Sequence, residues 1–224
     1  QYGETSTSYA GKKMANYYNA VSYIEEKNYD MAIKYLQNCY DINEANQDSS
    51  MSNGMPNYLY GIGWTHLQFG NIQEAQNSTK KLYELVDSIK NPKYDPYKTL
   101  YFFPLELEIQ IAVKLKDFEK SRLKLHEYRA IAKKNKHKYY RNSGYYNLRG
   151  RIALAEARYD DAIKDFNKYG QSDKRNMLGL AEAYEANGNL DEAKRLYQIL
   201  LNDKNFYFKP AFRRIEAKSK LETL

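Results

Sequence analysis

A small residue recurs along this chain in the same local setting, and this repetition constrains the fold more than any other feature. Each time, an aromatic or aliphatic residue is followed by two residues and then by the small one. The small residues are Ala32, Ala75, Ser121, Ala162 and Ala193, with spacings of 43, 46, 41 and 31 residues. A period of about 20 to 50 residues is typical of an array of repeated units rather than of one globule.

A second small-residue position lies twelve residues before each of these. It holds Ala20, Gly63, Gly150 and Ala181, and in the third unit the larger Ile109. Turn elements such as 69–71 (Phe-Gly-Asn) and 187–189 (Asn-Gly-Asn) fall between the two positions. Glycine and asparagine readily take the left-handed conformation that ends a helix. Each unit is therefore predicted to be a hairpin of two helices, which cross closely at the small side chains.

The spacing of larger residues around these positions is clearest near the C-terminus. The pattern there comprises Met177, Leu180, Ala181, Tyr184, Gly188, Leu190, Ala193, Tyr197 and Leu200. In these residues the chain resembles the tetratricopeptide repeat (TPR) family, with the best matches in 143–204 and a resemblance that extends over about 13–204. Two units depart from the family pattern, because Asn16 replaces a large apolar residue and Ser121 replaces alanine.

The resemblance implies an all-α fold, a right-handed α-solenoid of about five TPR-like hairpins with a C-terminal capping helix. No hairpin can bury its apolar face alone, so stacked neighbours complete the core and the ends need polar caps. We expect one superhelical domain over 1–224. The expected hairpins are 13–46, 56–90, 98–135, 143–170 and 174–204, and the expected capping helix is 209–222.

Catalytic motifs are scarce in this sequence. It has three histidines, at 66, 126 and 137, and one cysteine, Cys39, with no HExxH, paired CxxC or phosphate-binding loop. His66 is more simply explained as a packed helix residue, and Cys39 as a small buried hydrophobe. The sequence thus predicts a chain that is not an enzyme, needs no cofactor or metal, and has no small-molecule substrate.

Hydropathy argues against a membrane span, since the mean hydropathy is −0.85 and no apolar run approaches twenty residues. We therefore expect a soluble chain. It begins at Gln1 without a signal peptide. This start suggests either a processed export product or a domain taken from a longer chain, so cytoplasmic and exported locations both stay open.

In the family that this chain resembles, the first helices of successive hairpins line a concave groove that takes a peptide or partner helix. Tyr60, Trp64 and Gln68 share one side of a predicted helix beside its packing seam. The equivalent positions in the next unit are Glu106 and Gln110. Trp64 either faces the groove or packs between hairpins, and both interpretations stay open. The predicted partner-binding residues are Tyr17, Tyr60, Trp64, Gln68, Gln110, Asn147 and Arg151.

Positive charge is concentrated in 112–151, which holds 13 Lys and Arg against 3 Asp and Glu. The predicted basic patch is Lys133, Lys134, Lys136, Lys138 and Arg141. Such a run is explained by a solvated turn, by an acidic protein partner, or by binding of nucleic acid or another polyanion. Besides the preferred protein-interaction scaffold, the open alternatives are thus a polyanion binder and a regulatory module of a larger enzyme.

Overall fold

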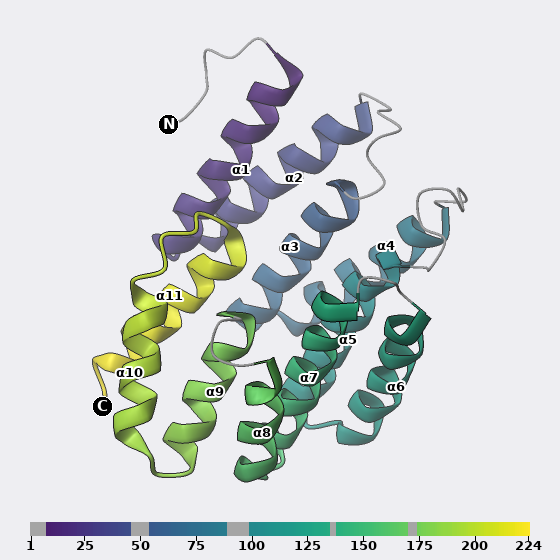
Figure 1. Cartoon of the computed structure of the whole chain (residues 1–224). Helices are drawn as coiled ribbons and strands as arrows, with labels where there is room; N and C mark the ends of the chain where they lie inside the picture. The colour runs from purple at the N-terminus through teal and green to yellow at the C-terminus, as the bar shows by residue number, and fades with distance from the viewer. Residues whose placement is uncertain (1–7, 46–53, 89–98, 135–137, 170–173) are drawn as a thin grey trace. The chain divides into compact units, whose positions relative to one another are not determined.

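The computed structural model describes residues 8–45, 54–88, 99–134, 138–169 and 174–224. These residues form eleven α-helices and no β-strand, with short 3-10 turns before α5 and after α8 (Figure 1). The helices are α1 (Tyr9–Glu25), α2 (Tyr29–Ala45), α3 (Gly54–Phe69), α4 (Ile72–Ser88), α5 (Phe102–Lys114), α6 (Phe118–Lys134), α7 (Lys138–Ala155), α8 (Tyr159–Phe166), α9 (Lys174–Ala186), α10 (Leu190–Leu201) and α11 (Phe208–Leu221). The all-α repeat fold predicted from the sequence is confirmed.

Every hairpin turn is built in the same way. One or two positions after the first helix ends, a residue has positive φ; it is Lys27, Gly70, Lys116, Ala157 or Gly188. In each turn the next N–H donates to the carbonyl five residues earlier, as Asn189 does to Tyr184 at 2.9 Å, and this bond defines the Schellman motif. Only two of these positions carry the glycine that the conformation favours. The repeat geometry therefore dictates the turn even where the local sequence opposes it.

Side chains at the start of the second helices complete these turns. Asn28 and Asn189 accept hydrogen bonds at 3.3 Å from the backbone N–H groups three residues later, and Asp117 accepts one at 3.0 Å. A side-chain oxygen at this position satisfies a donor that has no partner within the helix. The tight turn recurs in all five hairpins, whereas this side-chain cap occurs in three of them and is absent at Arg158 before α8.

The structure divides into two compact units, each with its own contacts. The first comprises 1–107 with 206–211, and the second comprises 108–205 with 212–224. Helices α5 and α11 contribute residues to both units. The expectation of a single domain over 1–224 stays a prediction.

In the first unit, α1 to α4 pack in chain order, each on the next. Ala20, Leu36 and Ile62 form a buried cluster from the first three helices. A Cβ added at Gly63 would lie 2.5 Å from Leu107 Cδ2 and 2.9 Å from Ser78 Cβ, so only glycine fits there without movement. At Gly63, one of the recurring small residues, α3 therefore approaches its neighbours too closely for a larger side chain.

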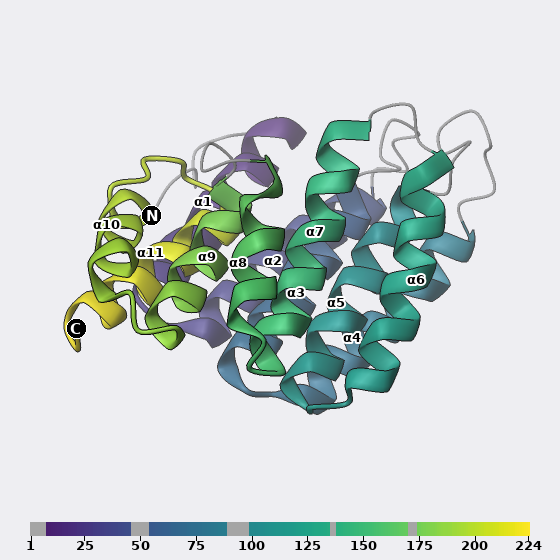
Figure 2. The same ribbon diagram turned by 60° about the horizontal axis from the view of Figure 1, so that its bottom comes forward.

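In the second unit, α6, α7, α8 and α9 lie side by side, as Figure 2 shows. The fully buried ring of Phe166 on α8 packs against two glycines. A Cβ at Gly150 on α7 would meet it at 2.8 Å, and one at Gly179 on α9 would meet it at 2.4 Å. The second of these positions does not belong to the small-residue pattern of the sequence.

Candidate functional site

Four of the predicted partner-binding residues lie in the first unit on first helices of hairpins, and three of these are aromatic. Tyr17 is on α1, and Tyr60 and Trp64 are one turn apart on α3. The rings of Tyr60 and Trp64 have centroids 5.9 Å apart. With Glu106 of α5, these residues form what we call the aromatic face: Tyr17, Tyr60, Trp64 and Glu106.

A short segment from the C-terminal end of the chain lies on the aromatic face. This docked segment, Phe206–Ala211, belongs to the same compact unit. The ring of Tyr207 is 6.2 Å from that of Tyr17, and the ring of Phe208 is 6.0 Å from that of Tyr60. The backbone N–H of Phe208 also donates to the Tyr17 hydroxyl at 3.4 Å. Residues of the predicted groove thus already contact a peptide segment, and that segment is the chain's own.

Lys209 adds the electrostatic part of this contact. Its ammonium group lies 2.8 Å from a carboxylate oxygen of Glu106. The same nitrogen lies 4.7 Å from the ring centroid of Tyr60 and 5.3 Å from that of Trp64. A cation within about 6 Å of an aromatic face is attracted by the ring quadrupole. The aromatic face therefore selects a positive charge at this point.

The aromatic face is buried at Tyr60 and half-buried at Tyr17, Trp64 and Glu106. Tyr60 is 1% exposed and Phe208 is 5% exposed. Burial raises the pKa of Tyr17 to about 12, against the opposing effect of the Phe208 N–H. The indole N–H of Trp64 is buried and has no acceptor among the residues that the structure describes. The fit between segment and face is therefore close but leaves one donor unsatisfied.

The other predicted partner-binding residues are not brought together with these. Gln68 is exposed at the end of α3, and Gln110 is half-buried on α5. In the second unit, the amide of Asn147 donates to the Arg175 carbonyl at 3.0 Å. Arg151 forms an ion pair with Glu182. Asn147 and Arg151 thus have partners within the chain, and a binding role for these residues stays a prediction.

The predicted basic patch is described only in part. Lys133 and Lys134 are exposed in the last turn of α6. Lys138 begins α7, and Arg141 lies in the first turn of that helix. Lys136 lies outside the described residues. Phosphate binding by this patch therefore stays a prediction.

The second unit contains a cationic site that the sequence did not reveal. A pocket of about 280 Å³, here called the arginine pocket, lies where α6, α7 and the turn before α8 meet. It is lined by Arg122, Leu125, His126, Arg129, Tyr145, Arg149, Ile152 and Arg158. The pocket residues on α6 recur at helical spacing, so the sequence alone could have placed them on one face of that helix. The sequence could not show that residues of α7 and of the turn before α8 lie against this face.

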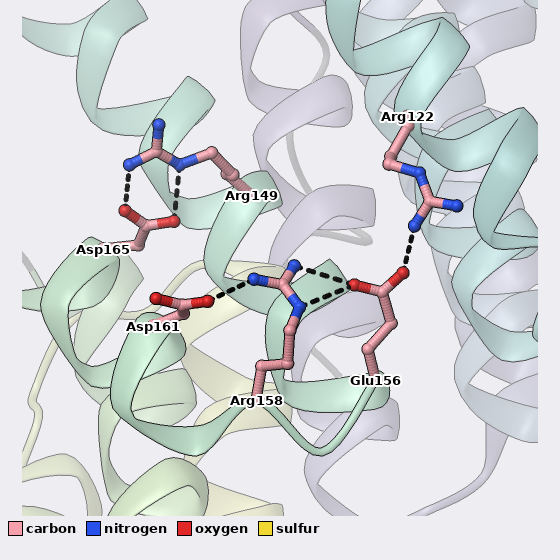
Figure 3. A network of polar contacts seen from close by, with 6 residues as sticks. All are labelled: Arg122, Arg149, Glu156, Arg158, Asp161 and Asp165. Carbon is pink, nitrogen blue, oxygen red and sulfur yellow. Dashed lines mark hydrogen bonds and ion pairs between the residues drawn. The ribbon is translucent and has the colours of Figure 1, made fainter.

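Carboxylates hold three of these arginines in place (Figure 3). Arg149 binds Asp165 through two nitrogens, with Nε at 2.6 Å from Oδ2. Arg158 approaches Glu156 at 2.7 Å and also pairs with Asp161, while Arg122 pairs with the same Glu156. The hydrogen bond to Asp165 raises the pKa of Arg149 further above its ordinary value. The network fixes guanidinium groups around the pocket.

Arg129 differs from the other arginines of the pocket. Its guanidinium lies 5.1 Å from the ring centroid of Tyr145. In the part of the chain that the structure describes, no carboxylate lies within ion-pair distance of it. Guanidinium groups bind carboxylate and phosphate oxygens through paired N–H donors. The arginine pocket therefore offers one uncompensated cation to an anionic group.

Cys39 lies buried and His66 half-buried among the helices rather than in a site. Cys39 is fully buried, burial raises its pKa to about 12, and its thiol lies 3.5 Å from the Lys13 carbonyl. Burial lowers the pKa of half-buried His66. Within the described ranges, no three His, Cys, Asp or Glu side chains form a group able to hold a metal ion. A search of the same residues finds no helix long and apolar enough to span a membrane.

Comparison with known families bears on these features. Models of the tetratricopeptide repeat match residues 9–46 and residues 175–203. The chain carries tetratricopeptide repeats. The first match covers the hairpin in which Asn16 departs from the family pattern, so the TPR assignment tolerates that departure. The second lies within the region where the sequence resemblance was strongest.

A solved structure supports the same TPR fold. A thermophilic TPR protein of Thermus thermophilus superposes with a TM-score of 0.52 at 18% identity, covering 92% of this chain and 99% of that one. At this identity the likeness shows the fold alone. The comparison with curated proteins gave no match. TPR repeats are generally modules for protein–protein interaction and are typically non-catalytic.

Proposed function

We propose that this TPR chain is an interaction module whose aromatic face binds a peptide or helix of a protein partner. The observation that carries the proposal is the convergence of Tyr17, Tyr60, Trp64 and Glu106 on one short peptide segment. These side chains come from three different first helices, as a groove on the TPR fold requires. Tyrosine and tryptophan are also the residues most enriched at binding hot spots.

A peptide-display selection against the full chain tests this role. Selected peptides should bind Trp64→Ala at least about tenfold more weakly, because a buried aromatic anchor is lost. Leu123→Ala is the matched control, since Leu123 is an exposed apolar residue of α6 outside the aromatic face. The thermal midpoint of each variant is measured in parallel. Equal loss of binding and folding in Trp64→Ala would identify Trp64 as core and contradict the proposal.

A second candidate function is the binding of a polyanion by the arginine pocket and the basic residues near it. The specific observation is that Arg129, beside three fixed arginines, has no ion-pair partner among the residues that the structure describes. A fluorescent single-stranded oligonucleotide is the probe. Its affinity should fall steeply with salt, and Arg129→Ala should reduce the slope of log K against log salt by about one phosphate contact. An unchanged slope would exclude the pocket from the contact.

A further inference from the structure

The docked segment shows which chemistry the aromatic face accepts. Phe208 and Lys209 are adjacent in sequence, and both contact the ring of Tyr60, one with a ring and the other with an ammonium group. The ammonium group also reaches Trp64 and Glu106. Pro210 follows in the first turn of α11, where its missing N–H has no intrahelical acceptor in any case. The face thus fits the start of a helix that carries an aromatic residue followed by lysine.

The docked segment fits the aromatic face incompletely, and this favours its replacement by a partner peptide. Tyr207 is 60% exposed although its ring lies near Tyr17. The indole N–H of Trp64 finds no acceptor in the described residues. A buried donor without an acceptor disfavours the closed state relative to one in which an acceptor is supplied. A partner peptide with a carbonyl or carboxylate oxygen near Trp64 would therefore bind better than the chain's own segment.

We propose that Phe206–Ala211 is an internal copy of the ligand, and that the partner presents a helix start with an aromatic residue followed by lysine and displaces it. This inference rests on the proposed function of the aromatic face. The chain's own segment then keeps the face closed, and the apparent affinity for a partner is reduced by the fraction of time that the face is open. Removing Phe208 and Lys209 from the chain opens the face without altering the face itself.

The probe is a synthetic peptide of residues 204–214, tested against the full-length chain. The opened variant carries Phe208→Ala and Lys209→Ala. It should bind the peptide at least about tenfold more tightly than the unaltered chain, a difference of ~1.4 kcal/mol. Trp64 is the single tryptophan of the chain, so its fluorescence reports directly on the face. Its emission should move to longer wavelength in the opened variant and return when the peptide binds.

Controls separate recognition from general stickiness and from misfolding. A peptide with alanine at positions 208 and 209 should bind neither protein. Circular dichroism checks that the opened variant keeps its helices. If it does not, Lys209→Ala alone is used, because Lys209 is partly exposed and its loss removes only the cation.

The outcomes distinguish this inference from the proposed function. Equal peptide affinity of the opened and unaltered chains, or no binding to either, overturns the inference. If displayed peptides without the aromatic–lysine pair still depend on Trp64, the aromatic face is a binding site and only the internal-copy inference fails. If peptide 204–214 binds the opened variant equally well after Trp64→Ala, the aromatic face itself is not the binding site.

Discussion

Replacing Gly179 with alanine tests whether close helix approach holds the second unit together. The added Cβ would lie 2.4 Å from Phe166 Cζ and 2.5 Å from its Cε1. The ring cannot retreat freely, because Phe166 is fully buried and the same edge of its ring also lies close to Gly150 on α7. Overpacking costs about 1–3 kcal/mol, and an approach as short as 2.4 Å belongs to the upper part of that range, about 2–3 kcal/mol. Alanine recovers about 1 kcal/mol of helix propensity, so we expect a net loss of about 1–2 kcal/mol.

The assay is thermal unfolding followed by circular dichroism at 222 nm. For a chain of this length, the expected loss lowers the midpoint by about 3–6 °C. Phe166→Leu removes the ring that the new methyl group meets, so the double variant Gly179→Ala, Phe166→Leu should lose less than the sum of the single variants. The expected coupling is about 1 kcal/mol. Additive losses, or an unchanged midpoint for Gly179→Ala, would show that the ring does not fill the seam between α7 and α9.

Three further predictions concern a turn, a hydroxyl and an ion pair. Ala157→Gly should raise the free energy of unfolding by about 0.5–1 kcal/mol, because its φ of 58° strains any residue with a Cβ, whereas Gly188→Ala should lower it by about 1 kcal/mol in urea titrations. Because the pKa of Tyr17 is raised in the folded chain, its protonated hydroxyl contributes fully to the free energy of unfolding below pH 10, and this contribution is lost as the pH rises toward 12. In Tyr17→Phe, the free energy of unfolding measured between pH 10 and 12 should lack this loss. Arg149→Ala should lower the free energy of unfolding by about 1–2 kcal/mol, since it leaves the buried carboxylate of Asp165 without its cation, and Arg149→Lys should restore part of it; a neutral Arg149→Ala would contradict a structural role.

Local pattern is enough to predict the fold, because each hairpin depends on residues close in sequence. The turn elements of the sequence include Gly70 and Gly188, and both have positive φ. Lys27, Lys116 and Ala157 occupy the same conformation without any local signal. They adopt it because packing of the two helices fixes the turn, and packing is not visible in a short stretch of sequence. The repeat spacing therefore predicts the turns better than residue type does.

The aromatic face could be predicted only in part, for a physical reason. Tyr17 and Tyr60 occupy equivalent positions of successive repeats, and Trp64 lies one helical turn after Tyr60, so periodicity alone places the three on one face. The residue that covers Tyr60 is Phe208, which lies next to the predicted capping helix and outside the predicted groove. The arginine pocket was missed for a similar reason, because α6, α7 and a turn each supply part of it.

Tyr17 and Phe208 are 191 positions apart in the sequence, yet they form a hydrogen bond. Stacking of each repeat on its nearest neighbour does not produce a contact over so long a separation. In a simple TPR array, stability is approximately a sum over repeats and adjacent interfaces, so a change in the last helix leaves the first hairpin unaffected. Here the first unit includes the docked segment, and its ring, hydrogen-bond and ion-pair contacts must break before the aromatic face is free. Loss of the Phe208 ring should therefore reduce amide-exchange protection in α1 and α3 as well as in the first turn of α11. Reduced protection in all three helices would show that the docked segment closes the aromatic face. Reduced protection in α11 alone would show that this helix only caps the last repeat.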